Sequence, residues 1–411
     1  MKRKLITAAI MMIATTCVYA NHPLLSREHM PERQISGATI PSSMDQAAAH
    51  IMHVASELIV PELAEMELGQ FGRLPAHASL DHAERLPDGT VIWSGSVHKQ
   101  KGTPGASTQS TDNNTVMDER NHVLLVNHDG KVTGNIKVDG KEYRIRPVGD
   151  HQHTVTEVDP SKLPQLSHDD AVPYPGGPSA HTHAATLNAD GTATIRVLIA
   201  YGARAERLTN DHYGLAALAV ARANEGFRNS GIDIHFELAS VLLMRQDEYR
   251  DIGMNLEWVT RNGDGFMDAI HQSRNDSRAD IVTLVAADSG GCGLGYLNPN
   301  EGGAFNVVDF NCFQGDNVFA HEAGHNMGAQ HDPANAGNGT HGAYPYGYGY
   351  QNYAVNHRTV MAYPCSGTNC DWGPIWSTPY RLFNGSPMGN THQSHNARVL
   401  QERRFTVANF R

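Results

Sequence analysis

The stretch His321-Glu322-Ala323-Gly324-His325-Asn326-Met327-Gly328-Ala329-Gln330-His331-Asp332 decides how the C-terminal half of this chain must fold. Residues four apart lie on one face of a helix, so the imidazoles of His321 and His325 can reach a single metal ion. Gly328 can adopt a positive φ at little cost and end the helix, which lets His331 turn back as a third ligand. Three protein ligands leave one position open for water, as in catalytic zinc sites.

Glu322 adds a carboxylate directly beside the first histidine. At that position it can take a proton from a water held at the metal, so we predict that it is the general base. A bare H-E-x-x-H string occurs by chance in about one window in ten thousand. Gly328, His331 and Asp332 at fixed offsets each lower that chance by a further factor of about twenty. A helix with incidental surface histidines is therefore the weaker interpretation.

The twelve residues resemble the HExxHxxGxxHD signature of the metzincin zinc peptidases, and the closing His-Asp pair is similar to the reprolysin or adamalysin branch. The resemblance implies one zinc ion on His321, His325 and His331. It also implies that Glu322 acts as general base and acid, with Asp332 in a supporting role.

Metzincins also carry a methionine turn beneath the zinc, and residues 359–363 (Thr-Val-Met-Ala-Tyr) match that pattern. Met361 would form an apolar floor under the histidines, although an ordinary buried methionine would look the same. Tyr363 occupies the position where astacins and serralysins have a tyrosine that can bind zinc or stabilise the transition state. A simple wall residue is the alternative for Tyr363.

The composition of the 411 residues is that of a globular protein with two domains and a leader. The formal net charge of -11 argues against a nucleic-acid or anionic-membrane partner, because such partners require a basic patch. Residues 1–20 combine a basic start, a short apolar stretch and a small-residue end, which predicts a signal peptide. The apolar stretch is too short for a stable membrane anchor, and the residues before Cys17 do not suit lipidation. We expect secretion, through the periplasm in a Gram-negative source.

Four cysteines remain after the leader, an even number that suits an oxidising compartment. We expect disulfides between Cys292 and Cys312 and between Cys365 and Cys370, because each pair closes a local loop. Zinc ligation by cysteine is the competing use, but the spacing lacks paired C-x-x-C motifs.

Residues 21–180 are predicted to form a small β-rich prodomain that ends in a Pro/Gly-rich linker at 173–179. Within it we expect a helix in residues 51–71 and strands at 90–93, 122–126 and 141–145. A targeting or adhesion domain that stays attached is the alternative.

Residues 192–411 alternate between strand and helix patterns, which predicts an α/β (α+β) domain with a twisted mixed sheet and a zinc helix. The expected strands are 194–201, 232–243, 280–287 and 305–309, and the expected helices are 215–227 and 263–274. This order is similar to the metzincin catalytic half. The resemblance implies that residues 293–297 form an edge strand on which an extended peptide pairs, although a glycine-rich hairpin would show the same sequence.

Residues 289–296, together with the methionine turn, resemble secreted bacterial reprolysin-like enzymes that include the peptidyl-Asp metallopeptidases. The resemblance implies cleavage on the amino side of aspartate, and Arg381 is the candidate cation for that side chain. A surface arginine is the alternative reading of Arg381. Residues 262–265 invite a calcium site, but they lack the spaced acidic ligands that calcium requires, so a turn that caps the next helix is favoured.

We expect the prodomain to inhibit the enzyme within the same chain. The sequence has no cysteine between the leader and Cys292, so a cysteine on the zinc cannot provide latency. Asp150, His151 or His153 could occupy the metal instead, or the prodomain could block the cleft by bulk.

The sequence thus predicts a secreted zinc endopeptidase that acts on proteins or peptides. Two other classes remain open: a secreted metal-binding or adhesive protein without catalysis, and a zinc hydrolase of a non-peptide amide. Glu322 argues against the first of these, because binding alone would not require a base.

Overall fold

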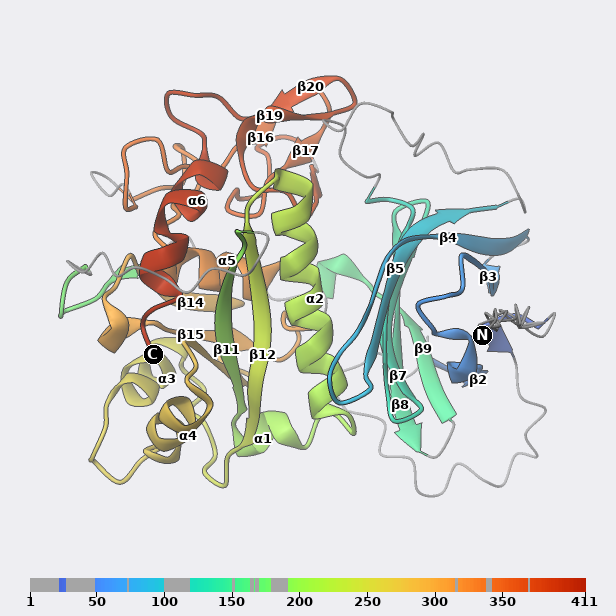
Figure 1. Ribbon diagram of the computed structural model, residues 1–411, viewed down its shortest axis with the longest axis horizontal. Coiled ribbons are helices and arrows are strands. Elements are labelled where there is room, and N and C mark those ends of the chain that lie inside the picture. Colours follow the sequence, from blue (N-terminus) through green and yellow to red (C-terminus); the bar gives the residue numbers. More distant parts are fainter. Residues whose placement is uncertain are drawn as a thin grey trace, which may run out of the picture.

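The computed structural model describes residues 22–26, 49–71, 74–99, 119–149, 152–162, 166, 170–178, 191–314, 317–337, 342–368 and 370–411. Figure 1 shows a β-sheet body at one side and a mixed sheet with helices at the other, with the long helix α2 (His212–Ser230) between them. The predicted signal peptide and Cys17 lie outside the described residues. No helix in the described ranges is long and apolar enough to cross a membrane.

The N-terminal body is a nine-stranded antiparallel sheet in the order β1-β2-β9-β8-β7-β6-β5-β4-β3. Its two ends approach each other, because the Leu24 amide donates to the Glu67 carbonyl at 2.7 Å, so the sheet nearly closes into a barrel. Asp129-Gly130 and Asp139-Gly140 have positive φ at both residues and make the tight hairpins. The strands are β1 (Leu25–Ser26), β2 (Ala49–Val54), β3 (Glu65–Phe71), β4 (Leu74–Arg85), β5 (Val91–His98), β6 (His122–His128), β7 (Lys131–Val138), β8 (Lys141–Gly149) and β9 (Gln152–Glu157).

The prediction of a helix in residues 51–71 is wrong. That stretch contains β2, the short 3-10 helix η2 (Ser56–Leu58) and β3. In β3, Met66 and Leu68 are buried while Glu65 and Glu67 are exposed, which is the period of two that a strand requires. The strands expected at 90–93, 122–126 and 141–145 correspond to β5, β6 and β8.

The second body contains a six-stranded mixed sheet in the order β10-β14-β15-β13-β11-β12, which confirms the predicted mixed sheet with helices. Neighbouring strands are parallel except β14, which runs antiparallel to β15. The strands are β10 (Ala171–Pro173), β11 (Ala193–Tyr201), β12 (Ile234–Leu243), β13 (Ile281–Ala286), β14 (Gly293–Leu297) and β15 (Phe305–Asp309).

The helices of this body are α1 (Ala203–Glu206), α2, α3 (Ile252–Thr260), α4 (Ala269–Ser277), α5 (Val318–Asn326) and α6 (Asn396–Val407). Sequence patterns missed α3. Small elements complete the fold: η3 (Pro160–Lys162), η4 (Glu301–Gly303), β16 (Gln351–Asn352), β17 (His357–Arg358), β18 (Asp371–Trp372), β19 (Thr378–Phe383) and β20 (Ser386–Met388).

Helix α2 is buried along nearly its whole length because it packs on β12 on one side and on barrel strands β6 and β7 on the other. The Asp211 carboxylate caps its start by accepting the Gly214 amide at 2.9 Å, and Gly231 ends it in the left-handed conformation. The Phe227 ring stacks on Trp376 and meets Phe236 edge-on. This helix therefore forms a large part of the contact between the two bodies.

A strand leads directly into the segment expected to be a linker at 173–179. Residues Ala171–Pro173 form β10 and pair in parallel with β14. The strand predicted to be an open edge is therefore covered by a piece of the chain that precedes the second body.

Candidate metal centre

Helix α5 carries the first two histidines of the predicted triad. The Asn317 carbonyl accepts the His321 amide at 2.8 Å and starts the helix. One turn later His325 brings its Nε2 to 3.1 Å from the Nε2 of His321. Gly328 follows the helix with φ +95, and a Cβ there would lie 2.6 Å from the Cβ of Ala343. Only glycine suits this turn, and it brings His331 back to the other two rings.

Main-chain carbonyls fix the orientation of the two helix imidazoles. The Nδ1 of His321 donates to the Val360 carbonyl at 2.9 Å, and the Nδ1 of His325 donates to the Ala329 carbonyl at 3.0 Å. This tautomer leaves each Nε2 with a lone pair for a metal. Burial lowers the pKa of His325 to about 3 and also lowers the pKa of His331, so both rings are neutral, the form that binds metals.

Asp170 is the fourth member of the cluster, and sequence reasoning missed it. Its Oδ1 lies 2.5 Å from the Nε2 of His331 and 3.6 Å from that of His325, and its Oδ2 lies 3.7 Å from the Nε2 of His321. The four ligand atoms all lie within 4.8 Å of one another. Ligands about 2.0–2.1 Å from a tetrahedral zinc would be about 3.3 Å apart, close to these separations.

Unpaired polar atoms support a cation between these groups. The Nε2 of His331 and the Oδ1 of Asp170 are buried and close, yet neither has a hydrogen-bond partner among the described residues. Burial acts to raise the pKa of Asp170, but the three imidazoles outweigh it and hold that pKa well below its usual range. Three imidazoles and one carboxylate are a donor set that suits zinc rather than calcium, which prefers oxygen ligands alone.

Glu322 lies beside the cluster and is fully buried. Neither of its carboxylate oxygens has a hydrogen-bond partner in the part of the chain that the structure describes. Burial, and then the charge of Asp170, raise its pKa well above the usual value. The side chain packs on β14, where a Cβ at Gly293 would lie 2.1 Å from Oε1, so the glycines of β14 make room for this carboxylate.

The methionine turn lies under α5. Met361 is fully buried, and a Cβ at Gly324 would lie 2.9 Å from its Sδ. The Tyr363 hydroxyl donates to the Oδ2 of Asp170 at 2.7 Å, and its ring lies 4.8 Å from that of His331. Asp332 accepts the main-chain amide of Tyr363 at 3.0 Å and so ties the histidine loop to this turn.

The two disulfides have the predicted partners. Cys292 pairs with Cys312, and Cys365 pairs with Cys370. The first bond links the start of β14 to the loop after β15. The second closes a short loop just after the methionine turn.

Other predicted residues lie elsewhere. His153 is on β9, where its Nε2 accepts the Val132 amide at 2.9 Å inside the barrel, so its prediction as a metal ligand is wrong. Asp150 and His151 lie outside the described residues. Arg381 is on β19, with its guanidinium against Gly231 at the end of α2.

The loop at residues 262–265 forms a turn rather than an acidic ligand set. The Asp268 carboxylate accepts the amides of Gly263 at 2.7 Å and Gly265 at 2.9 Å. Asp268 also stands at the N-cap of α4, but its side chain makes no cap hydrogen bond to that helix, so the turn precedes the helix without capping it.

Comparisons with known proteins agree with this geometry. Residues 216–332 match the family described as metallo-peptidase family M12B, reprolysin-like. A peptidyl-Asp metalloendopeptidase of Stenotrophomonas maltophilia (strain K279a) is 36% identical over 334 residues, which cover 80% of this chain and 79% of that protein. One of Xanthomonas campestris pv. campestris is 32% identical over 408 residues, which cover 96% of this chain and 94% of that protein, so the similarity includes the barrel.

Proposed function

This chain belongs to the family of the peptidyl-Asp metalloendopeptidases, and from that premise we propose that it is secreted as a latent precursor and cleaves proteins on the amino side of aspartate. Its activity is that of a zinc metalloendopeptidase. In this proposal residues 1–20 are the signal peptide, residues 21–180 the propeptide, and residues 192–411 the catalytic domain.

His321, His325 and His331 would hold the zinc ion through their Nε2 atoms. When bound, zinc polarises the scissile carbonyl and lowers the pKa of its water from 15.7 towards about 7. Glu322 takes the proton from the attacking water and delivers it to the leaving amine. The Tyr363 hydroxyl, which points at the same centre, would hydrogen-bond the developing oxyanion of the substrate.

The observation that carries this proposal is the position of Glu322. A buried carboxylate without hydrogen-bond partners among the described residues is costly, and it lies beside three imidazoles with converging lone pairs. A protein that only binds metal would gain nothing from it. The carboxylate also packs on β14, a strand that already pairs with an extended peptide segment, which favours a peptide over another amide as substrate.

Glu322→Gln tests the assignment. The amide keeps the volume of the side chain but cannot accept the proton, so we expect a hundred- to ten-thousand-fold loss of kcat on casein, in the range that a general base supplies. Zinc content, measured by elemental analysis, should stay at one ion per chain.

Glu237→Gln is the matched control, because Glu237 is an exposed residue of β12, and its activity should equal that of the parent. Chelation should abolish the parent activity and zinc should restore it. A Glu322→Gln protein that digests casein at the parent rate would remove the proposed role.

Two arginines are candidates for the cation that accepts the aspartate side chain. Arg381 remains the prediction from sequence. Arg358 is added because its Nη1 donates to the Ala362 carbonyl of the methionine turn at 2.5 Å, and its guanidinium lies 4.2 Å from the centre of the Trp372 ring.

Arg381→Gln and Arg358→Gln separate them in a peptide library that varies the residue after the scissile bond. Losing the accepting guanidinium removes about 1.5–3 kcal/mol, or about ten- to a hundredfold in kcat/KM for aspartate. Peptides with asparagine there should change little. If neither variant changes the ratio of aspartate to asparagine cleavage, neither residue is the cation. Thermal unfolding of both variants checks the buried Arg358 for loss of fold.

A further inference from the structure

We infer that residues 170–178 are a built-in inhibitor of this enzyme, in which Asp170 takes the fourth position at the metal and β10 occupies the strand position of a substrate. The inference rests on the proposed function, because it needs a metal on the three histidines. It names the segment that provides latency, which the sequence analysis did not identify.

The side chain of Asp170 fills the position that the attacking water needs. It is fully buried, and one of its oxygens lies 2.5 Å from the Nε2 of His331. The other oxygen accepts the hydroxyl proton of Tyr363 at 2.7 Å. A carboxylate held by the triad and by Tyr363 excludes a water from the space next to Glu322, so the base has no proton to accept.

The main chain of the same residue is attached to the catalytic sheet. The Gly295 amide donates to the Asp170 carbonyl at 2.9 Å, and the parallel register continues through Ala171 opposite Gly295 to Pro173 opposite Leu297. Without β10, β14 would be the end of the described sheet. An extended substrate that adds a strand to this edge must displace β10 first.

A tyrosine anchors the segment beyond the strand. The ring of Tyr174 meets that of Tyr296 edge-on at 5.1 Å and fills a slot over η4. A Cβ at Gly303 would lie 2.4 Å from the Cγ of Tyr174, so the slot exists only because glycine lines it.

Asn300 fixes the last residues of the segment. Its main-chain amide donates to the Gly177 carbonyl and its side-chain amide to the Gly176 carbonyl, both at 3.0 Å. The segment is thus attached at both ends. Cleavage of the chain beyond residue 178 would be needed to let it leave with the propeptide.

The test uses the full-length precursor in a Glu322→Gln background, so that the chain stays intact. Asp170→Asn keeps the shape of the side chain, Asp170→Ala removes it, and Asp159→Asn is the control, because Asp159 is an exposed carboxylate of the same region that bonds only to Ser161 among the described partners. Each protein is loaded with Co²⁺, and its visible spectrum reports the ligands. Acetohydroxamate is then titrated as a small chelating probe.

We expect both Asp170 variants to change the Co²⁺ spectrum and to bind acetohydroxamate at least about tenfold more tightly than the parent precursor. The probe binds only to molecules in which the fourth metal position is open, so a small open fraction weakens the apparent affinity of the parent in proportion. Asp159→Asn should match the parent. Tyr174→Ala, which keeps the Asp170 ligand but loses its anchor, should bind the probe with intermediate affinity.

The outcomes separate the two proposals. A precursor that binds no Co²⁺ in any form would reject the zinc centre itself. Stoichiometric Co²⁺ with identical spectra and equal probe affinity in parent and Asp170→Asn would overturn the inhibitory role alone. If Asp170→Ala fails to fold in a thermal scan, the near-isosteric Asp170→Asn still decides the question.

Discussion

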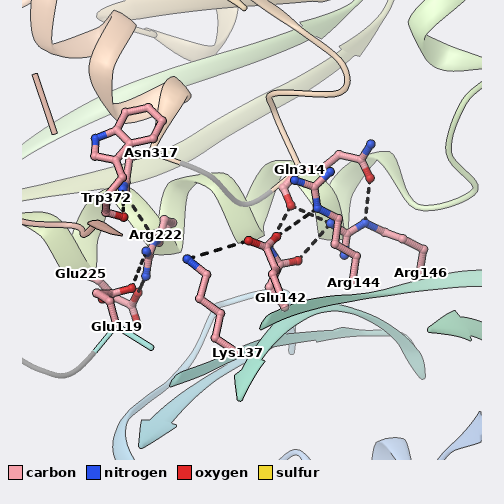
Figure 2. A network of polar contacts seen from close by, with 11 residues as sticks. Glu119, Lys137, Glu142, Arg144, Arg146, Arg222, Glu225, Gln314, Asn317 and Trp372 are labelled. Carbon is pink, nitrogen blue, oxygen red and sulfur yellow. Dashed lines mark hydrogen bonds and ion pairs between the residues drawn. The ribbon is translucent and has the colours of Figure 1, made fainter. Parts of the chain in front are cut away.

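Two buried polar clusters in this protein differ in how their atoms are paired. At the metal centre, nitrogen and oxygen atoms of His331, Asp170 and Glu322 converge without hydrogen-bond partners among the described residues. In the second cluster, which we call the docking network, opposite charges pair directly, although the Oε1 of Glu119 has no hydrogen-bond partner among the described residues. Its members are Glu119, Lys137, Glu142, Arg144, Arg146, Arg222, Glu225, Gln314, Asn317 and Trp372, and Figure 2 shows them between the barrel and the catalytic body.

Arg222 of α2 is the centre of the docking network. Its guanidinium contacts Glu119 at 2.7 Å, Glu225 at 3.2 Å and Asn317 at 3.2 Å. From the barrel, Arg146 donates to the Gln314 carbonyl at 2.7 Å. Hydrogen-bonded and ion-paired atoms of this kind hold two bodies in one arrangement. Buried polar atoms that have no hydrogen-bond partner and point towards one position indicate a ligand there. The distinction assigns attachment to one cluster and chemistry to the other.

The two clusters meet at α5, because Asn317 immediately precedes that helix. If each cluster has the role assigned to it, damage to one should leave the signature of the other intact. The predictions below test that independence, from the largest effect to the smallest.

The largest effect is expected from His325→Ala. Removing one of three imidazoles leaves too few ligands for stable zinc binding. Activity should therefore fall at least about ten-thousandfold, which is the largest loss expected from removing a general base. Zinc content by elemental analysis and kcat/KM on casein measure both losses.

The matched control is His392→Ala, which removes an exposed imidazole and should retain zinc and activity. In the His325→Ala protein the barrel should stay docked on the second body, so its near-ultraviolet circular dichroism spectrum should match that of the parent. A His325→Ala protein with stoichiometric zinc would contradict the assignment of the centre.

Arg222→Met should destabilise the folded chain without changing its metal site. The methionine has similar length but leaves Glu119 buried without its arginine and Glu225 with His122 alone, which costs about 3–5 kcal/mol in the free energy of unfolding. Urea denaturation measures the loss, and the Co²⁺ spectrum should match the parent.

Arg196→Met removes a partly exposed arginine that faces Glu237 at 3.7 Å, and it should cost no more than about 1 kcal/mol. Equal losses from both arginine variants would show that the docking network contributes no more than a surface ion pair. A changed Co²⁺ spectrum in Arg222→Met would show instead that Asn317 couples the two clusters.

The metal centre was predictable because its three histidines and its general base lie within twelve consecutive residues. His321, His325 and Gly328 are close in sequence, and the geometry of one helix and one turn converts their spacing into a site. Both disulfides close short loops, which is why local pairing predicted them.

Asp170 could not be predicted in this way, because its role depends on a parallel pairing between distant segments. It precedes a Pro/Gly-rich stretch that looked like a linker, and a single aspartate carries no local pattern. The helix expected at residues 51–71 failed for a related reason, since pairing with β4 and β9 selected strands there. The buried ion pair of Arg222 and Glu225 could not be predicted either, because charged residues on a helix usually face solvent.

The smallest predicted effect is a pH dependence of docking through His122 of the barrel, whose Nε2 lies 3.1 Å from Glu225. Burial acts to lower the pKa of His122, but Glu225 more than offsets it and the pKa is raised. This contribution is fully present below the ordinary histidine pKa of 6.5 and is lost as pH rises through the higher value in the folded state.

The carboxylates act in the opposite direction. Burial acts to raise the pKa of Glu119 and Glu225, but Arg222 and His122 hold both below the usual 4.5, so their contribution is lost only as pH falls below that value. Above pH 6.5 the free energy of unfolding should therefore fall with rising pH through His122. His122→Gln should flatten this slope, whereas the exposed His392→Gln should keep it. A slope that persists in His122→Gln would place the titrating group outside the docking network and weaken its assignment as the attachment between the two bodies.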